Sequence, residues 1–358
     1  MKKDNTFLKN YKKLKVLITG TTGFKGSWLA FWLHSLGANI TGVSLKPEKE
    51  SILFSVLQLE KKINQKYVDI RDFKKLNDII KIFKPDIIFH LAAQSIVSKS
   101  FSDPLNTVAT NVLGSTNILE SYRLNKIPAL VYITSDKCYL NLNKKTNFKE
   151  SDTLGGLDNY SSSKAGAEII FSSYFNSYFK NKNFLSSATA RAGNVIGGGD
   201  MKKNRIIPDI IKSLKNNKRL TLRNPTATRP WQHVLEPLSG YLMLGDKLLN
   251  KKLNIKLKPN WNFGPKLKNC KNVRNITNLV IKNWNNKNIE IKLNKKNVYH
   301  ESKFLTLNIL KAKKELNWEP RLNLEETIKL TVDWYKNYFK RRNSENFTLD
   351  QIDYYLKK

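Results

Sequence analysis

The chain has 358 residues, 40% of them hydrophobic, and its 63 Lys and Arg outnumber 29 Asp and Glu to give a formal net charge of +34. No apolar run approaches the roughly 20 residues that a membrane-spanning helix needs, and two cysteines, Cys138 and Cys270, are too few for a disulfide framework or a metal cluster. We therefore expect a cytoplasmic protein with no membrane partner and no metal site, long enough for a main domain and a smaller lobe.

The positive charge suggests a nucleic-acid partner, but its distribution argues against one. Lysines are spread along the chain together with abundant Asn and Ile, as AT-rich coding produces, and they concentrate in polar segments such as 247–258 and 282–297. The sequence contains no single basic helix, zinc-finger spacing or aromatic RNA-binding motif. We expect no nucleic-acid partner, and a cationic surface that attracts an anionic substrate.

The stretch Lys15–Gly26, KVLITGTTGFKG, predicts a strand, a glycine turn and the start of a helix. Its first residues form a short apolar run, glycines follow at Gly20, Gly23 and Gly26, and a helical apolar face continues over 24–33. Glycine lets the backbone turn sharply and approach the phosphates of a dinucleotide, whose charge is favoured at a helix N-terminus. By itself the G-x-x-G-x-x-G spacing is weak evidence, and an ordinary strand-to-helix loop is the alternative.

The chain then alternates apolar runs with helical segments up to Gly193. Five further strands are predicted at 39–44, 67–70, 85–93, 129–134 and 187–192, with one long amphipathic helix at 103–124. This alternation predicts an α/β fold, a doubly wound parallel sheet of the Rossmann type that binds NAD(P). The second strand ends without the acid that often holds the adenosine ribose, which leaves NAD and NADP both open.

After Gly193 the pattern changes to short helices and loops with many prolines. We predict a dinucleotide-binding domain over 1–193, a smaller lobe over 194–340 that closes over the C-terminal edge of the sheet, and a helical tail over 341–358. A helix near 237–250 is expected to return to the main domain. Asp69, at the end of the third predicted strand, either contacts the adenine or caps the following helix.

Two groups of residues carry chemistry. Tyr160 and Lys164 are four apart and share one helical face, so we expect the ammonium and an oxidised nicotinamide to lower the phenol pKa and make Tyr160 a base. Ser135, Asp136 and Lys137 follow the fifth strand, at the edge where open α/β sheets bind ligands. Asp136 and Lys137 put an acid and a base side by side there, although such a pair also occurs as a plain loop cap.

The glycine turn, His90-Leu91-Ala92-Ala93 and the Tyr160/Lys164 pair make the chain resemble the extended short-chain dehydrogenase/reductase family. Within it the chain resembles the nucleotide-sugar 4,6-dehydratases, most closely those that act on CDP-glucose. The matching segments are 19–33, 134–139, 191–200, 229–241 and 261–265, and the similarity runs from about residue 14 to 340. In the relatives acting on dTDP-glucose and GDP-mannose, Glu holds the position of Lys137.

This resemblance implies an internal redox cycle on CDP-glucose with NAD, which yields CDP-4-keto-6-deoxyglucose for deoxysugar and surface polysaccharide synthesis. It implies that Tyr160 takes the C4 hydroxyl proton, Lys137 assists removal of the C5 proton, and Asp136 protonates the leaving C6 hydroxyl. Ser135 would bond the sugar hydroxyl, and the chain would form a homodimer. Besides Tyr160 and Lys164, the implied cofactor-binding residues are Gly20, Gly23, Phe24, Lys25, Gly26, Asp69, Ile70, Leu91, Ala92 and Ala93.

The implied substrate-binding residues are Gln94, Arg191, Asn194, Ile207, Arg229 and His233. Arg229 offers a fork suited to a diphosphate, whereas packing beside Trp231 explains His233 slightly better than substrate binding does. Two other functions remain open. An epimerase or 4-keto-reductase of the same fold needs Tyr160 but no acid at position 136, and a catalytically silent dinucleotide-binding protein would be expected to lose Tyr160 or Lys164.

Overall fold

A seven-stranded parallel sheet forms the centre of the computed structural model, which describes residues 5–181, 186–253, 259–285, 289–293 and 302–358. The strand order is β12-β7-β5-β4-β1-β2-β3. The strand bounds are β1 Lys15–Thr19, β2 Asn39–Ser44, β3 Asn64–Tyr67, β4 Ile87–His90, β5 Ala129–Ile133, β7 Ser186–Arg191 and β12 Asn260–Asn262. The order reverses direction between β1 and β4, and such a reversal is where open α/β sheets bind ligands. The expected doubly wound α/β fold is confirmed.

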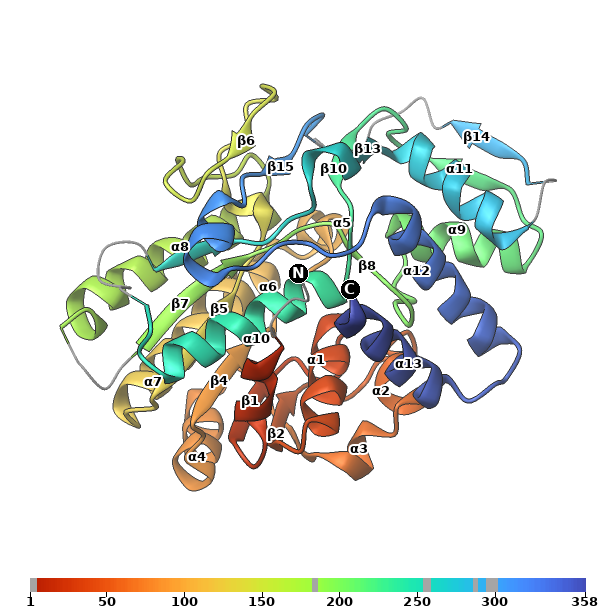
Figure 1. Cartoon of the computed structure of the whole chain (residues 1–358). Coiled ribbons are helices and arrows are strands. Elements are labelled where there is room, and N and C mark those ends of the chain that lie inside the picture. The colour runs from red at the N-terminus through yellow and green to blue at the C-terminus, as the bar shows by residue number, and fades with distance from the viewer. Residues whose placement is uncertain (1–4, 182–185, 254–258, 286–288, 294–301) are drawn as a thin grey trace.

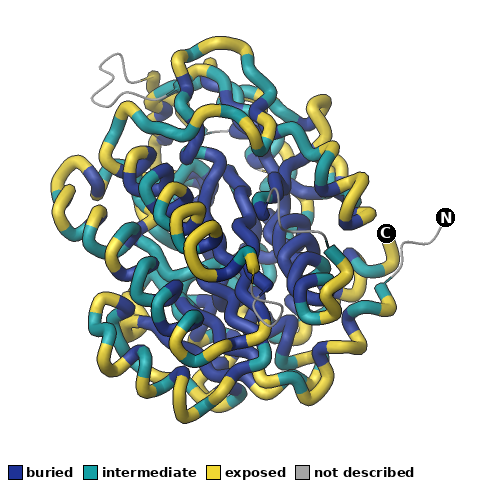
Figure 2. Tube along the Cα trace, turned by 90° about the vertical axis from the view of Figure 1, so that its left-hand side faces the viewer, coloured by how far each residue is buried: buried dark blue, intermediate teal, exposed yellow. Residues whose placement is uncertain are grey.

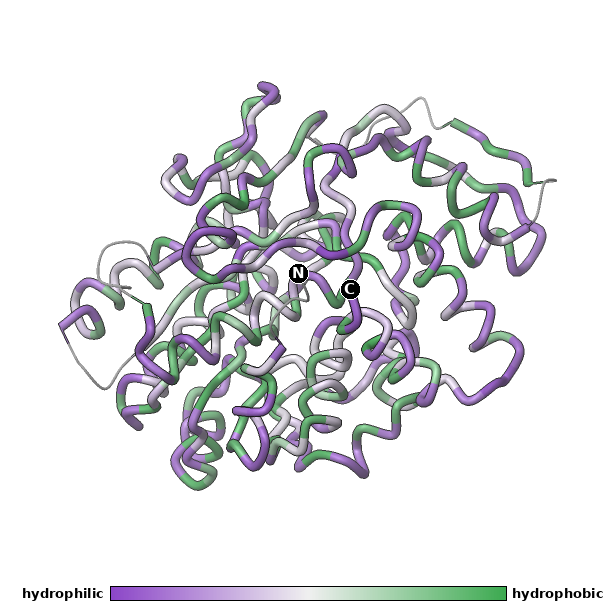
Figure 3. The backbone as a smooth tube through the Cα atoms, in the orientation of Figure 1, coloured by the Kyte–Doolittle hydropathy of each residue, from purple (hydrophilic) through white to green (hydrophobic). Residues whose placement is uncertain are grey.

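Helices cover both faces of the sheet (Figure 1). One apolar cluster joins α1 (Phe24–Ser35) and α10 (Leu235–Leu249) to side chains such as Val16, Phe89 and Val131 on one face. A second cluster joins α4 (Phe73–Phe83), α7 (Ser115–Leu124) and α8 (Asn159–Tyr174) to the other face. Because both faces are covered, the strands are buried at the centre of the molecule, as the dark blue core of Figure 2 and the green strands of Figure 3 show.

The predicted position of the third strand is wrong, whereas the predicted helical segments are present with internal divisions. The third strand is at Asn64–Tyr67, not at 67–70, because an edge strand with partly exposed faces needs backbone pairing with β2 more than apolar side chains. The helix expected at 103–124 is α6 (Pro104–Val108), a π turn (Ala109–Gly114) and α7. The end of the chain forms two helices, α12 (Leu324–Phe339) and α13 (Ser344–Lys357), and the second corresponds to the helical tail expected over 341–358.

The second half of the chain lies partly on the sheet and partly beside it. The expected returning helix is α10, which begins at Leu235 and packs on β5 and β7, and β12 extends the sheet beside β7. Smaller paired strands form the remainder, at the upper right of Figure 1. They are β8 (Val195–Ile196) with β11 (Gln232–His233), β9 (Leu220–Leu222) with β14 (Ile291–Leu293), and β10 (Thr228–Pro230) with β13 (Cys270–Asn272).

The remaining elements connect these parts. They are α2 (Ile52–Val56), α3 (Leu59–Lys62), α5 (Val97–Ser102), α9 (Ile206–Lys215), α11 (Val273–Trp284), and β6 (Asn147–Phe148) paired with β15 (Thr306–Leu307). The C-terminal helix α13 is anchored to α1, since Tyr355 is buried and packs edge-on against Trp32 of α1 at 6.1 Å between ring centroids. Among the described helices none combines the length and the apolar character that crossing a bilayer requires.

Candidate active site

The glycine turn connects β1 to α1 with almost no space to spare. Gly20 has φ of +79°, and a Cβ there would lie 2.8 Å from the backbone nitrogen of Ala92. A Cβ on Gly26 would lie 2.0 Å from the carbonyl oxygen of Gly20. The turn therefore requires glycine at both positions, and it brings the N-terminus of α1 to the carboxyl end of the sheet, where anions are favoured.

A cavity of about 690 Å³ runs from this turn across the carboxyl edge of the sheet and under the second half of the chain. Most of the predicted site residues line it. They are Gly20, Gly23, Phe24, Lys25, Gly26, Asp69, Ile70, Leu91, Ala92, Ala93, Gln94, Ser135, Asp136, Lys137, Tyr160, Asn194, Ile207 and Arg229. Three predicted site residues, Lys164, Arg191 and His233, do not line it.

At the end of the cavity next to β2 and β3, Asp69 is already paired. Its carboxylate binds Arg71, with 2.6 Å between Oδ2 and Nη2, and Arg71 also donates to the side chain of Asn106. The hydrogen bond from Arg71 holds the pKa of Asp69 below its ordinary value. The sequence analysis missed Arg71, although an Arg two residues after a strand-end Asp is the signal that points to this pair.

Asp136 lies directly beyond β5 and is almost fully buried. The hydroxyl of Ser135 donates to its Oδ1 at 3.0 Å, and the amide of Asn194 donates to its Oδ2 at 3.3 Å. Burial raises the pKa of Asp136, and the neighbouring charge of Lys137 opposes that rise. A buried carboxyl with a raised pKa is suited to donating a proton.

Tyr160 and Lys164 lie on α8, which Asp158 caps by accepting from the backbone N–H of Ser161 at 2.9 Å. In the protein alone, burial raises the pKa of Tyr160 to about 12, against the hydrogen bond with Ser135 and the charge of Arg205. The expected lowering of this pKa includes the charge of an oxidised nicotinamide and stays a prediction. Burial also lowers the pKa of Lys164 to about 8.

The residues at this edge fit a dinucleotide. Lys164 is buried, and its ammonium has no hydrogen-bond or ion-pair partner within the described part of the chain. A buried unpartnered ammonium is costly, and hydroxyls of a bound ribose would supply the missing acceptors. Lys164 does not itself line the cavity, but it lies one helical turn beyond Tyr160, which does, and the glycine turn offers backbone N–H groups for the phosphates elsewhere along the cavity.

Two predicted substrate-binding residues are placed elsewhere, which corrects those predictions. Arg191 does not line the cavity and pairs with Glu168, both being buried, with 2.7 Å between Nη2 and Oε2. His233 is fully buried and packs edge-on against Trp28 at 6.0 Å between ring centroids, and burial lowers its pKa to about 3. The alternative of a packed histidine is thus supported, with Trp28 rather than Trp231 as the partner.

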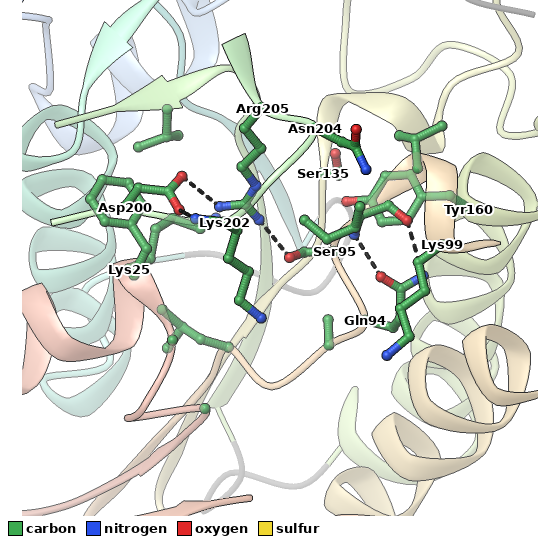
Figure 4. A pocket seen from close by; sticks show the side chains of 18 of the residues that line it. Lys25, Gln94, Ser95, Lys99, Ser135, Tyr160, Asp200, Lys202, Asn204 and Arg205 are labelled. Carbon is green, nitrogen blue, oxygen red and sulfur yellow. Dashed lines mark hydrogen bonds and ion pairs between the residues drawn. The ribbon is translucent and has the colours of Figure 1, made fainter. Parts of the chain in front are cut away.

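The cavity also contains Arg205, a cation that the sequence analysis missed. Its guanidinium donates from Nη1 to Asp200 at 2.7 Å and from Nη2 to the hydroxyl of Ser95 at 2.6 Å (Figure 4). It lies two residues before Ile207, which the sequence analysis did single out, so its position next to that predicted substrate-binding residue was the available signal. Among the described residues no group of three or more His, Cys, Asp and Glu side chains is arranged to hold a metal ion.

Comparisons with known proteins agree with this geometry. The family model described as GDP-mannose 4,6 dehydratase matches residues 17–331. The CDP-glucose 4,6-dehydratase of Salmonella typhimurium strain LT2 is 42% identical over 331 residues, which cover 91% of each chain.

Two solved structures share the fold. The dTDP-glucose 4,6-dehydratase of Bacillus anthracis, solved in complex with NAD, has a TM-score of 0.75 at 24% identity, covering 92% of this chain and 98% of that one. An epimerase of Methanothermobacter thermautotrophicus has a TM-score of 0.80 at 24% identity, covering 94% of this chain and 96% of that one.

Proposed function

Because the chain belongs to the GDP-mannose 4,6 dehydratase family, we propose that it is a hydro-lyase that converts CDP-glucose to CDP-4-keto-6-deoxy-D-glucose with NAD. The identity of 42% over nine-tenths of the chain to a CDP-glucose 4,6-dehydratase supports this substrate. NAD, when bound, accepts a hydride from C4 of the sugar and returns it to C6. The product leaves with no net change in the oxidation state of the cofactor.

The residues of the cavity divide the proton transfers among them. Tyr160 takes the proton of the C4 hydroxyl, and Ser135 holds that hydroxyl by a hydrogen bond. The resulting 4-keto group acidifies the C5–H bond, so that Lys137 can remove this proton. Asp136 then protonates the C6 hydroxyl, which leaves as water. Asn194 holds Asp136 in place and Lys164 binds the cofactor ribose, whereas Arg229 and Ile207 bind the nucleotide part in the smaller lobe.

The burial of Asp136 at the reacting edge is the observation that favours dehydration over epimerisation or 4-keto reduction. An epimerase or a 4-keto-reductase needs Tyr160 but has no hydroxyl to protonate at C6, and so gains nothing from a buried acid beside the reacting edge. Here Asp136 is buried, its pKa is raised by burial, and it lines the same cavity as Tyr160 and Lys137. That arrangement supports dehydration over the two alternatives.

The test is incubation of the purified protein with CDP-glucose and, separately, with dTDP-, UDP- and GDP-sugars. The absorbance of 4-keto-6-deoxy sugars in alkali is measured without added cofactor, with NAD and with NADP. We expect a signal with CDP-glucose that depends on NAD. A protein that binds NAD but gives no signal with any of these sugars would instead be assayed as an epimerase or reductase, and the dehydratase proposal would fall.

We also propose that the protein is a cytoplasmic homodimer. Both cysteines are free, and Cys138 is buried. Large apolar side chains that are 45–84% exposed lie on α6, the π turn and α8, elements that pack against one another. They are Leu105, Val108, Leu113 and Ile169. A second copy of the same surface would remove these side chains from water.

A further inference from the structure

One side chain connects the two halves of the molecule across the cavity. Arg205 occupies the residue directly before α9 in the second half of the chain, and its side chain makes no capping hydrogen bond to that helix. Its guanidinium binds Asp200, which follows β8, and Ser95, which follows β4 of the central sheet, at 2.7 and 2.6 Å. Asp200 is itself fixed, since its carbonyl oxygen accepts from the hydroxyl of Tyr335 at 2.5 Å. The planar fork of Arg205 therefore bridges the two halves with defined geometry.

The charge of this bridge acts on Tyr160. Both side chains line the same cavity, and in Figure 4 the Tyr160 ring and Arg205 lie on either side of Ser95. The charge of Arg205 lowers the pKa of Tyr160 against the larger effect of burial, whereas Asp136 and Asp158 raise it and the hydroxyl of Ser135 lowers it. Arg205 also lowers the pKa of Lys25 in the glycine turn, after burial and Lys164.

We propose that Arg205 is a positioning residue that holds the smaller lobe against Ser95 and thereby brings a positive charge to Tyr160 for removal of the C4 hydroxyl proton. This inference rests on the proposed dehydratase function. In the step concerned, the O–H bond of the C4 hydroxyl breaks and the proton passes to the Tyr160 phenolate. Arg205 exchanges no proton, because guanidinium stays charged throughout the accessible pH range.

The position of Arg205 in the chain gives the bridge a second consequence. Arg205 is followed directly by Ile206, Ile207 and Pro208, which line the same cavity. The segment that receives the nucleotide part of the substrate is thus covalently joined to the charge that acts on Tyr160. Binding of the nucleotide to this segment therefore also fixes the guanidinium of Arg205 near Tyr160, the catalytic base.

The test compares Arg205→Gln, which removes the charge, with Arg205→Lys, which keeps it. Arg219→Gln serves as the matched control, since Arg219 pairs with Glu290 on the surface of the same lobe and does not line the cavity. The pH profile of kcat with CDP-glucose is measured for each. Loss of a nearby opposite charge raises the pKa of a phenol, so the acidic limb of Arg205→Gln is expected about one pH unit or more higher.

At pH 7 we therefore expect kcat of Arg205→Gln to fall about tenfold or more and to recover as the pH rises, because one pKa unit corresponds to a factor of ten in the phenolate fraction. Arg205→Lys and Arg219→Gln are expected to keep the acidic limb of the wild-type protein. A kcat of Arg205→Gln that falls by one factor at every pH, or an equal displacement of the limb in Arg219→Gln, would overturn the inference.

A second measurement does not depend on turnover. Hydrogen exchange of the backbone amides in 93–99 and 197–212 is compared between the wild-type protein, Arg205→Gln and Ser95→Ala. We expect faster exchange in both segments of both variants, because each loses the bridge. Unchanged exchange would disprove the bridge even if CDP-glucose is turned over. A wild-type protein that does not turn over CDP-glucose would count against the proposed function instead.

Discussion

Arg191 of β7 and Glu168 of α8 form a buried ion pair, with 2.7 Å between Nη2 and Oε2, directly behind the reacting edge of the sheet. Glu168 also accepts from the hydroxyls of Thr134 at 2.5 Å and Thr189 at 3.0 Å. Thr134 immediately precedes Ser135, and Glu168 lies one helical turn beyond Lys164. The pair therefore fixes the end of β5 relative to the face of α8 that carries Tyr160.

Removal of the charge in Glu168→Gln should be strongly destabilising, because Arg191 is left charged in the interior without its anionic partner. Breaking a buried pair typically costs about 3–5 kcal/mol, and we expect the free energy of unfolding in urea to fall by that amount. Glu120→Gln is the control, since Glu120 pairs with Arg123 at a partly exposed site. An exposed pair contributes about 0–1 kcal/mol, so equal losses in the two variants would contradict this interpretation.

Isotope exchange distinguishes the proposed roles of Asp136 as the acid and Lys137 as the base. In deuterated water Lys137→Met should fail to incorporate deuterium at C5, because this residue removes that proton. Asp136→Asn should still exchange C5 but eliminate water about 10²–10⁴ times more slowly, the usual loss for a general acid. Mass spectrometry of the recovered sugar measures both. Incorporation at the normal rate by Lys137→Met would disprove its role as the base.

The need for glycine at Gly20 in the glycine turn can be tested against Gly37, a position outside the turn, since both residues have φ of +79°. Alanine in this left-handed region costs about 1–2 kcal/mol, and Gly37→Ala should lose only that, because its Cβ would meet nothing closer than 3.6 Å. Gly20→Ala adds a clash at 2.8 Å with the backbone of Ala92. We expect a larger loss of unfolding free energy and, by calorimetry, weaker binding of NAD for Gly20→Ala alone.

Lys164 predicts a specific dependence of stability on pH. Burial lowers its pKa from 10.5 to about 8, against the opposing effect of the negative charge on Glu168. Between these values the unfolded chain binds more protons than the folded one, so this group makes stability rise with pH over that window. A difference of this size corresponds to about 3 kcal/mol. Stability on this account is lowest below pH 8.

The variant Lys164→Met should therefore be more stable than the wild-type protein at pH 7 and should lack much of its gain in unfolding free energy between pH 8 and 10. Urea unfolding at a series of pH values measures this difference. Lys81→Met, at an exposed position of α4, is the control and should follow the wild-type curve. A Lys164→Met curve with the same pH dependence as the wild type would show that the ammonium is not buried as described.

The proposed dimer is tested by charging its exposed apolar surface. Leu105 is 84% exposed and Ile169 is 54% exposed. Leu105→Glu and Ile169→Glu should each give a monomer in sedimentation experiments, because a carboxylate would have to be buried in the interface. Ile82 is 82% exposed on α4, and Ile82→Glu should leave the dimer intact. Dissociation by all three variants would place the interface elsewhere.

Much of this protein is determined by local sequence. The glycine turn, the order of strands and helices, the polar triplet after β5 and the Tyr160/Lys164 spacing all depend on residues close in the chain, whose periodicity reports the secondary structure directly. Parallel strands that end at one edge then bring these groups together, so the cavity was predictable to within its main lining residues. The first and last residues of strands and helices were less predictable. For β3, backbone pairing with a neighbouring strand decides where this edge strand ends.

The tertiary structure decided what depends on partners far apart in the chain. The sequence predicted Arg191 to bind substrate, but in the folded protein it pairs with Glu168. His233 likewise packs against Trp28 instead of lining the cavity. The role of Arg205 depends on Asp200 and Ser95, which the fold brings within hydrogen-bond distance of its guanidinium. The pKa values of Tyr160 and Asp136 are likewise raised by burial, since the cost of desolvating a charge depends on everything packed around it rather than on neighbouring sequence.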